Sequence, residues 1–374
     1  MGGVKRSAFA AKQVQLRRPT MQASDGMPLL APNARQIAEP SSARPLLIVA
    51  VDTEAEFDWD GPFLRTLTNV RNLRHQAKAQ EIFDRFGVRP VYLVDYAVAT
   101  QAEGYLPLKE IIQSQRCEIG AHLHPWITPP FVEQLSDRTS FSQNLPASVQ
   151  KEKLSRLTEA IVSNLGVQPV SYRAGRYGVG EEIAEILNSL DYSIDMSVQP
   201  GIDMRYRNGP DFRKAVDKPY WFGGRGALLE IPATCGFVGL IAHPAFPKSL
   251  SVQVYKQIAR PRLNQMRSLG MFARLCLLER IPLTPEGVTS SELRRVTSML
   301  LSHGQRVFVL SYHSSSLQPG NTEYVKSAAE LSQFLARIES YLEFFMGELG
   351  GMSMTPADLR ATLLPRESGV AGPS

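Results

Sequence analysis

The chain has 374 residues, of which 43% are hydrophobic and 21% are charged, a composition typical of a globular protein with a large core. Residues 1–44 hold seven Lys and Arg residues and only two acids, so the rest of the chain is formally neutral, and the pI near 9.1 gives no support for nucleic-acid binding. Three widely separated cysteines argue against a disulfide framework and fit a reducing compartment.

The two ends of the chain carry few signals for regular structure. Residues 1–44 are basic and polar and contain no continuous apolar stretch, so we expect a disordered basic leader rather than a secretory signal. Residues 349–374 predict a flexible tail. No run of about 18 apolar residues occurs, so no membrane-spanning helix is expected. Together these features predict a cytoplasmic protein.

Short apolar runs alternate with helical stretches from residue 46 onward. Strands are predicted, in chain order, at residues 46–51, 90–94, 117–120, 169–173, 193–196, 228–231 and 306–312. Helices are predicted at residues 72–86, 108–114, 148–165, 180–190, 290–302 and 321–345. Glycines such as Gly87 and Gly166 mark helix ends, because glycine readily adopts the left-handed conformation that ends a helix.

The alternation of strands and helices implies parallel strands joined by helical crossovers. About seven parallel strands favour an α/β fold of the distorted (β/α) barrel type over an open doubly wound sheet. The barrel is expected to span residues 45–348, with an irregular insertion at about 201–290. Because such barrels carry their site at the carboxyl ends of the strands, the residues that follow each strand are the first candidates for chemistry.

Residues 251–280 of the insertion are basic. They contain six Lys and Arg residues but only one acid, Glu279, and they include the apolar run from Met271 to Leu278. This pattern is more typical of the basic outer face of a packed helix, and it also fits a helix that lies on an anionic membrane surface. Peripheral contact with the inner face of the membrane is therefore one of two open interpretations.

Two pairs of side chains near strand ends predict a metal site. Asp52 and Glu54 follow the strand at 46–51 with a spacing that points both to one side. A carboxylate at the end of a buried strand is costly unless it is paired or binds a metal. His122 and His124 have the same spacing, and imidazole with carboxylate is a donor set that holds a divalent metal. The alternative is a pair of hydrogen-bonded histidines in a structural turn.

Two further segments place polar residues at strand ends. The segment from Arg173 to Gly178 contains Arg176 and Tyr177, and its glycines allow close approach of the backbone. Its arginines are candidates either for tying loops together or for catalysis. His313 ends the last strand, where a structural role and a catalytic role are both open.

The order of these motifs resembles that of the NodB-like polysaccharide deacetylases, carbohydrate esterase family four. The resemblance rests on the acidic pair, the histidines after Glu118-Ile119-Gly120, the arginine-glycine loop, the segment Asp195-Met196-Ser197-Val198 and the late His313. The His-Pro-Trp turn, the segment from Leu283 to Gly287 and the segment from His313 to Gly320 resemble a divergent branch associated with bacterial surface-polysaccharide proteins. The similarity covers roughly residues 46–345.

The resemblance implies a role for each matching residue. It makes Asp52 the catalytic base, Arg173 the group that steadies it, His313 the general acid and Asp195 an acid that supports that histidine. It makes Glu54 and His122 ligands of a divalent metal, with zinc expected. The family's second metal histidine follows the first by four residues, where this chain has Trp126, so His124 is predicted as the third ligand. Trp126, Arg176 and Tyr177 are predicted to contact the substrate, and the Tyr177 N–H to stabilise the oxyanion.

The predicted function is a metal-dependent deacetylase that hydrolyses the N-acetyl amide of a sugar in a polysaccharide or glycolipid precursor. A second hypothesis is a catalytically silent barrel that binds carbohydrate or a protein partner. It rests on the altered histidine spacing. A third keeps the hydrolase but changes the acyl group to formyl or another small amide.

Overall fold

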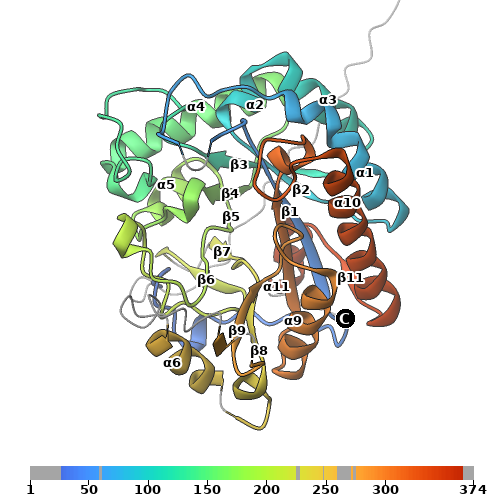
Figure 1. The fold of residues 1–374 in the computed structure, drawn as a ribbon. Helices are drawn as coiled ribbons and strands as arrows, with labels where there is room; N and C mark the ends of the chain where they lie inside the picture. Colours follow the sequence, from blue (N-terminus) through green and yellow to red (C-terminus); the bar gives the residue numbers. More distant parts are fainter. Residues whose placement is uncertain are drawn as a thin grey trace, which may run out of the picture.

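The computed structural model describes residues 27–58, 61–224, 228–246, 248–258, 271–272 and 275–364. A curled sheet of parallel strands forms its centre, and helices surround the sheet (Figure 1). The parallel strands are β1 (Leu46–Thr53), β2 (Val91–Val94), β3 (Glu118–Leu123), β4 (Ser171–Ala174), β5 (Ile194–Asp195), β7 (Leu228–Glu230) and β10 (Val307–His313). Their order in space is β10-β1-β2-β3-β4-β5-β7, and β6 (Tyr220–Phe222) pairs antiparallel with β7 at the edge. The predicted α/β barrel of about seven parallel strands is confirmed.

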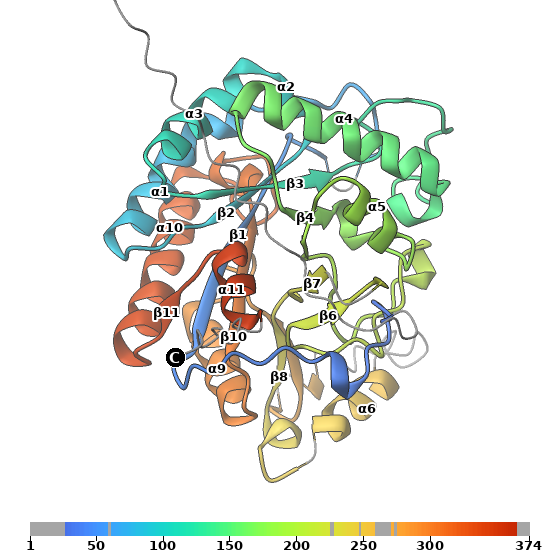
Figure 2. The same cartoon turned by 180° about the vertical axis from the view of Figure 1, so that it is seen from behind.

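The helices that cover the sheet are seen from two sides in Figures 1 and 2. They are α1 (Gln76–Arg85), α2 (Tyr96–Thr100), α3 (Ala102–Gln113), α4 (Ala147–Leu165), α5 (Ile183–Ser189), α9 (Ser290–Ser302) and α10 (Ala328–Leu342). Local sequence fixes several of their ends. Thr289 with Glu292 forms a capping box at the start of α9, and Gly166 ends α4 with φ 73°.

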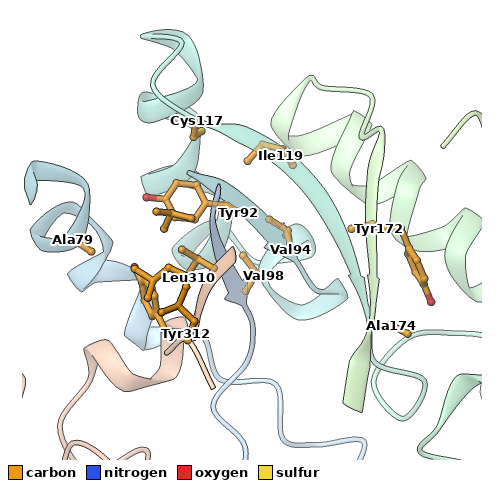
Figure 3. Packing of buried hydrophobic residues seen from close by; sticks show 14 of the residues in the cluster. Ala79, Tyr92, Val94, Val98, Cys117, Ile119, Tyr172, Ala174, Leu310 and Tyr312 are labelled. Atoms are coloured by element: carbon orange, nitrogen blue, oxygen red, sulfur yellow. The ribbon is translucent and has the colours of Figure 1, made fainter. Parts of the chain in front are cut away.

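Successive side chains of each strand point to opposite faces of the sheet. The outer side chains pack against the helices, and Figure 3 shows part of this layer, including Tyr92, Ile119, Tyr172 and Leu310. The inner side chains fill the barrel with a separate apolar cluster that includes Ile48, Ala50, Leu93, Ile194 and Val309. Polar residues that continue this inner series therefore face the barrel mouth.

The described strands do not close the barrel, because no ladder joins β10 to β7. Single hydrogen bonds bridge the seam: Ser311 N donates to the Leu283 carbonyl (3.1 Å), and Val309 N donates to Thr234 Oγ1 (2.8 Å). The hairpin of β8 (Cys235–Val238) and β9 (Glu279–Pro282) lies beside this seam. Neither β6 nor this hairpin is predicted by the sequence, which reads there as an irregular insertion.

Both predicted disordered ends are partly ordered, which corrects the expected boundaries. Leu29 is fully buried, and the Gln36 side chain donates to the Trp221 carbonyl at 2.9 Å, so residues 27–44 pack on β6. After residue 349, β11 (Met352–Ser353) pairs with β1, and α11 (Pro356–Leu363) buries Leu359 in the inner barrel cluster. Both segments are polar on average, but each contains a few apolar residues that become buried, and the average composition does not reveal them. Residues 1–26 and 365–374 lie outside the described part of the chain.

Helix α6 (Lys248–Ile258) accounts for part of the basic segment predicted at 251–280. Residues 259–270 and 273–274 of that segment lie outside the described residues, so the choice between a membrane surface and a packed helix stays open. Among the residues that the structure describes, no helix combines the length and the apolar content needed to cross a bilayer.

Candidate active site

A cavity of about 810 Å³ opens at the carboxyl ends of the strands. On β1, the inward series that buries Ile48 and Ala50 continues to Asp52, and on β10 the same alternation places His313 inward. Strand alternation therefore brings together residues distant in the sequence. Those that line the cavity include Asp52, Glu54, His122, His124, Arg176, Tyr177 and His313.

The three predicted metal ligands meet at one point of this cavity. Glu54 Oε2 lies 3.4 Å from His122 Nε2 and 3.4 Å from His124 Nε2. One potential ligand atom from each residue lies within 4.8 Å of the others, and all three side chains are buried. The convergence of Glu54 with both histidines is what the sequence motifs require of a metal site.

The outer ring nitrogens of both histidines are held by neighbouring groups. His122 Nδ1 lies 3.2 Å from the Arg173 carbonyl, which can only accept, so this nitrogen carries the proton. His124 Nδ1 lies 3.4 Å from Asp95 Oδ2. A Cβ at Gly175 would collide with the His124 ring, so this glycine permits the close approach. With Nδ1 of each ring donating to an oxygen, each Nε2 atom directs its lone pair toward Glu54. Histidines that bind metals are commonly oriented in this way.

The electrostatics of the trio fit a bound cation. Both carboxylate oxygens of Glu54 and the His124 Nε2 atom are buried and have no hydrogen-bond partner among the described residues. Burial raises the pKa of Glu54 to about 7 and lowers the pKa of His124 to about 3. Two imidazole lone pairs facing a buried carboxylate repel one another, and a divalent ion removes that repulsion. One carboxylate and two imidazoles would leave one open position on a tetrahedral ion, as at catalytic zinc sites.

Asp52 forms a charged pair with Arg173 beside the trio. Arg173 NH1 donates to Asp52 Oδ1 at 2.6 Å, and Arg173 Nε donates to the Met196 carbonyl at 3.0 Å. Burial opposes ionisation of Asp52, but the guanidinium and nearby histidines hold its pKa below the ordinary value. The lowered pKa favours the ionised form of Asp52, and its second oxygen, Oδ2, lies 3.8 Å from His313 Nε2.

His313 is oriented by Glu286, a residue to which sequence reasoning gave no role. His313 Nδ1 lies 2.9 Å from Glu286 Oε2, and its backbone N–H donates to Glu286 Oε1 at 3.1 Å. Burial by itself lowers the pKa of His313, but Glu286, Glu54 and Asp52 raise it well above the usual 6.5. His313 therefore holds a proton that its Nε2 can deliver to the cavity. The signal for Glu286 was present in the segment from Leu283 to Gly287.

Asp195 differs from its expected role as the acid that supports His313. Its neighbours Ile194 and Met196 fill the barrel, so Asp195 points to the outer face of the sheet, where it pairs with Glu230 across β5 and β7. It accepts a hydrogen bond from Ser197 Oγ, which in turn accepts one from Ala174 N at 2.8 Å. The pKa of Asp195 is raised to about 7 by burial. Asp195 therefore supports the backbone of β4 behind the site.

Trp126 also differs from its predicted contact with substrate. It is 1% exposed, and its ring stacks on His124 with a centroid distance of 4.5 Å. The loop that follows His124 is held by Lys153 of α4, whose buried ammonium donates to the carbonyls of Pro125 (3.0 Å) and Thr128 (2.7 Å). These two residues fix the position of His124 rather than forming the cavity wall, and the sequence gave no signal for Lys153.

Arg176 and Tyr177, for which the sequence predicts substrate contacts, both line the cavity. Both have positive φ, 55° and 57°, a conformation that side-chain-bearing residues rarely adopt. The Arg176 guanidinium lies 3.9 Å from the centre of the Phe141 ring and 2.9 Å from Asp137 Oδ1. This backbone strain, held by specific contacts, is typical of functional sites.

Comparison with known proteins gives matches among solved structures alone, because no family model and no curated protein matches the chain. A protein from Mycobacterium smegmatis described as a polysaccharide deacetylase is 16% identical, with 92% of this chain and 97% of that chain covered and a TM-score of 0.49. A family 4 carbohydrate esterase from Streptomyces lividans in complex with acetate is 10% identical, with coverages of 85% and 93% and a TM-score of 0.36. A CE4 family pseudoenzyme from Bacillus anthracis is 8% identical, with coverages of 85% and 66% and a TM-score of 0.37. Polysaccharide deacetylases are thus among the structural neighbours, as the motifs predict, and the low identities transfer no activity.

Proposed function

We propose that this protein is a metal-dependent deacetylase that hydrolyses the N-acetyl amide of a sugar. The observation that carries the proposal is the meeting, in one cavity, of an incomplete cation site with an ionised base and a protonated acid. Glu54, His122 and His124 form the proposed cation site. Asp52 is the proposed base and His313 the proposed acid. In metal-assisted amide hydrolysis the cation polarises the carbonyl, the base accepts a proton from water and the acid protonates the departing amine.

The side chains divide the work between attack and departure. Asp52, ionised beside Arg173, accepts a proton from the water whose oxygen adds to the amide carbonyl. The carbon–nitrogen bond then breaks, and His313 donates its proton to the departing amine nitrogen. The backbone N–H of Tyr177 is the proposed donor to the oxyanion. A divalent ion held by Glu54, His122 and His124 would polarise the carbonyl and lower the pKa of water in the site.

The finer features of the proposal concern the metal and the substrate. Zinc is the proposed metal, since two imidazoles and one carboxylate match its preferred donors. The proposed substrate is an N-acetylated sugar within a polysaccharide or glycolipid precursor. A cavity of about 810 Å³ with Tyr206 and Tyr324 on its rim supports a substrate larger than one acetyl group, because aromatic faces pack against sugar rings.

Metal content and acetate release test the proposal together. The purified protein should bind one equivalent of zinc and, loaded with zinc, release acetate from N-acetylhexosamine oligomers or lipid-linked N-acetylated sugars. Glu54→Gln should lose both properties. Glu56→Gln is the matched control, because Glu56 lies two residues along the same segment and accepts a backbone hydrogen bond that glutamine can keep. A folded protein that takes up no metal and releases no acyl group would favour the silent carbohydrate-binding barrel instead.

A further inference from the structure

A second, smaller cavity adjoins the main one. It has a volume of about 270 Å³, and six of its lining residues also line the main cavity: Asp52, Tyr177, Gln199, Ile202, His313 and Tyr324. Glu54, His122 and His124 line the main cavity but not the side cavity. The side cavity therefore begins at the base and the acid and leads away from the proposed metal ligands.

The far wall of the side cavity is the β8–β9 hairpin beside the open seam. Cys235, Arg280 and Pro282 all line the cavity, which agrees with strand alternation, because Cys235 is paired with Pro282 and Arg280 lies two residues from it. Gly236, the next residue of β8, faces α9: a Cβ there would lie 2.6 Å from Val296 Cγ2. Arg280 is therefore on the cavity face of the hairpin by register.

Arg280 brings an unbalanced positive charge to this wall. The side chain is half-buried, and the structure pairs it with no carboxylate among the described residues. Its neighbour Glu279 lies on the opposite face of the hairpin and pairs with Arg295 of α9 at 3.9 Å. A half-buried guanidinium that lines a cavity and has no counter-ion is available to pair with an anion that enters the cavity.

The two carboxylates of the side cavity are already engaged. Asp52 binds Arg173, and Glu286 binds His313. The hydroxyl groups of Thr284 and Ser311 line the same space, and hydroxyls donate hydrogen bonds to anionic oxygens. Guanidinium groups recognise carboxylate and phosphate by paired, charge-assisted hydrogen bonds. The side cavity thus has donors for an anion and lacks the anion itself among the described residues.

We propose that the side cavity binds a negatively charged group of the substrate through Arg280. This inference rests on the proposed deacetylase function and specifies its substrate class. The group is a carboxylate or phosphate, carried either by the sugar whose amide is cleaved or by the acyl chain. In both cases the amide lies at the junction of the two cavities, where Asp52 and His313 reach it.

Kinetics of Arg280→Met with matched substrates test the proposal. Three zinc-loaded assays compare a neutral N-acetylhexosamine oligomer, the same sugar bearing a phosphate or uronate carboxylate, and an N-succinyl amine. Arg280→Met should lower kcat/KM for an anionic substrate by roughly 10- to 100-fold, which is the loss of one charge-assisted hydrogen-bonded pair, and leave the neutral substrate near its wild-type value. Loss on the sugar phosphate or uronate identifies the sugar as the source of the charge, and loss on the succinyl amide identifies the acyl chain.

Two controls make the outcome decisive. Arg295→Met removes an arginine of α9, which pairs with Glu279 on the other face of the hairpin, and should leave kcat/KM for all three substrates unchanged. Arg280→Lys should recover part of the anionic preference, which separates charge from misfolding. Equal values of kcat/KM in Arg280→Met and wild type for both anionic substrates, or equal losses on neutral and anionic ones, would overturn the proposal.

A binding measurement separates this inference from the proposed function. Titration of the metal-free protein with inorganic phosphate and with glucuronate should show binding that Arg280→Met weakens about tenfold or more. If no substrate is hydrolysed but this binding depends on Arg280, the deacetylase proposal fails and the anion site stands. If binding is identical in the two proteins, the anion site fails whatever the activity.

Discussion

The two halves of the candidate site differ in how their charges are balanced. In the acid–base half, Asp52 has Arg173 and His313 has Glu286, so each charged group has its counterpart in the chain. In the ligand half, the two oxygens of Glu54 and the Nε2 of His124 have no hydrogen-bond partner among the described residues. Neighbouring groups hold both halves in place, and only the His313 side chain is partly exposed. The difference indicates that one half is complete as folded, whereas the other is shaped for a component that the chain does not supply.

The largest effect is expected from Glu54→Gln, which removes a proposed metal ligand from the ligand half. Zinc at about 100 times its dissociation constant should stabilise the wild-type protein against unfolding by about 2.7 kcal/mol, because the ion binds only the folded state. Glu54→Gln should lose this stabilisation and all acetate release. Thermal unfolding with and without zinc, with Glu56→Gln as control, measures it. An equal zinc-dependent stabilisation of Glu54→Gln would contradict the assignment.

Asp52→Asn breaks the acid–base half and should spare the ligand half. Removal of the base should lower kcat by about 10²- to 10⁴-fold, the usual contribution of general base catalysis. Zinc content should remain at the wild-type level, since Asp52 is not placed among the ligands. Steady-state kinetics and metal analysis on the same preparation provide the measurement. Loss of zinc from this variant would place Asp52 in the metal site instead.

A smaller effect is expected from Asp95→Asn, which changes the group that holds His124 in the ligand half. Asp95→Asn keeps the side-chain oxygen that caps α2 through Val98 N, but removes the charged oxygen that lies beside His124 Nδ1 and accepts from Ala55 N. Zinc affinity should fall by about 10- to 100-fold, the typical effect of losing such a support, and kcat at saturating zinc should change little. Competition with a chelator of known affinity measures the change. An unchanged zinc affinity would show that the charge of Asp95 does not support His124, and would leave Asp95 its two backbone hydrogen bonds from Val98 N and Ala55 N.

The smallest expected effect concerns the pH dependence of the acid. Glu286 raises the pKa of His313, so the histidine keeps its proton to higher pH, and activity should fall only as pH rises through that raised pKa. Glu286→Gln keeps a hydrogen-bond acceptor but removes the charge. Its alkaline limb of kcat should therefore move to lower pH, with a decrease of about tenfold or less at neutral pH. A pH profile with an unmoved alkaline limb would assign the proton to another group.

The sequence identified the strand-end residues well, because strand alternation is local. Asp52, Glu54, His122 and His124 follow apolar runs whose inward series could be read from spacing alone. Asp195 lies in a strand of two residues, too short for its face to be read from the pattern, and the structure places it outward. Glu286 contacts His313 from a loop that crosses the open seam. The segment from Leu283 to Gly287 marked this loop, but no local pattern encodes which distant side chain Glu286 contacts.

The boundaries of the fold were less predictable for the same reason. Residues 27–44 are polar on average, but Leu29 and Gln36 find partners on β6, which itself was hidden in an irregular segment. Lys153 would be expected on a solvated helix face, and its buried ammonium instead ties the loop after His124. Such residues depend on which segments meet in three dimensions.

The unclosed seam between β10 and β7 lies beside a part of the chain that can change during evolution without changing the strands of the site. The strands that carry the base, acid and ligands are locked into a continuous ladder, whereas the β8–β9 hairpin meets the barrel through single hydrogen bonds. A relative could lengthen, shorten or exchange this hairpin without disturbing the register of any catalytic strand. Substrate specificity can therefore change most readily at the seam, and an engineer seeking a new substrate should begin with the β8–β9 hairpin.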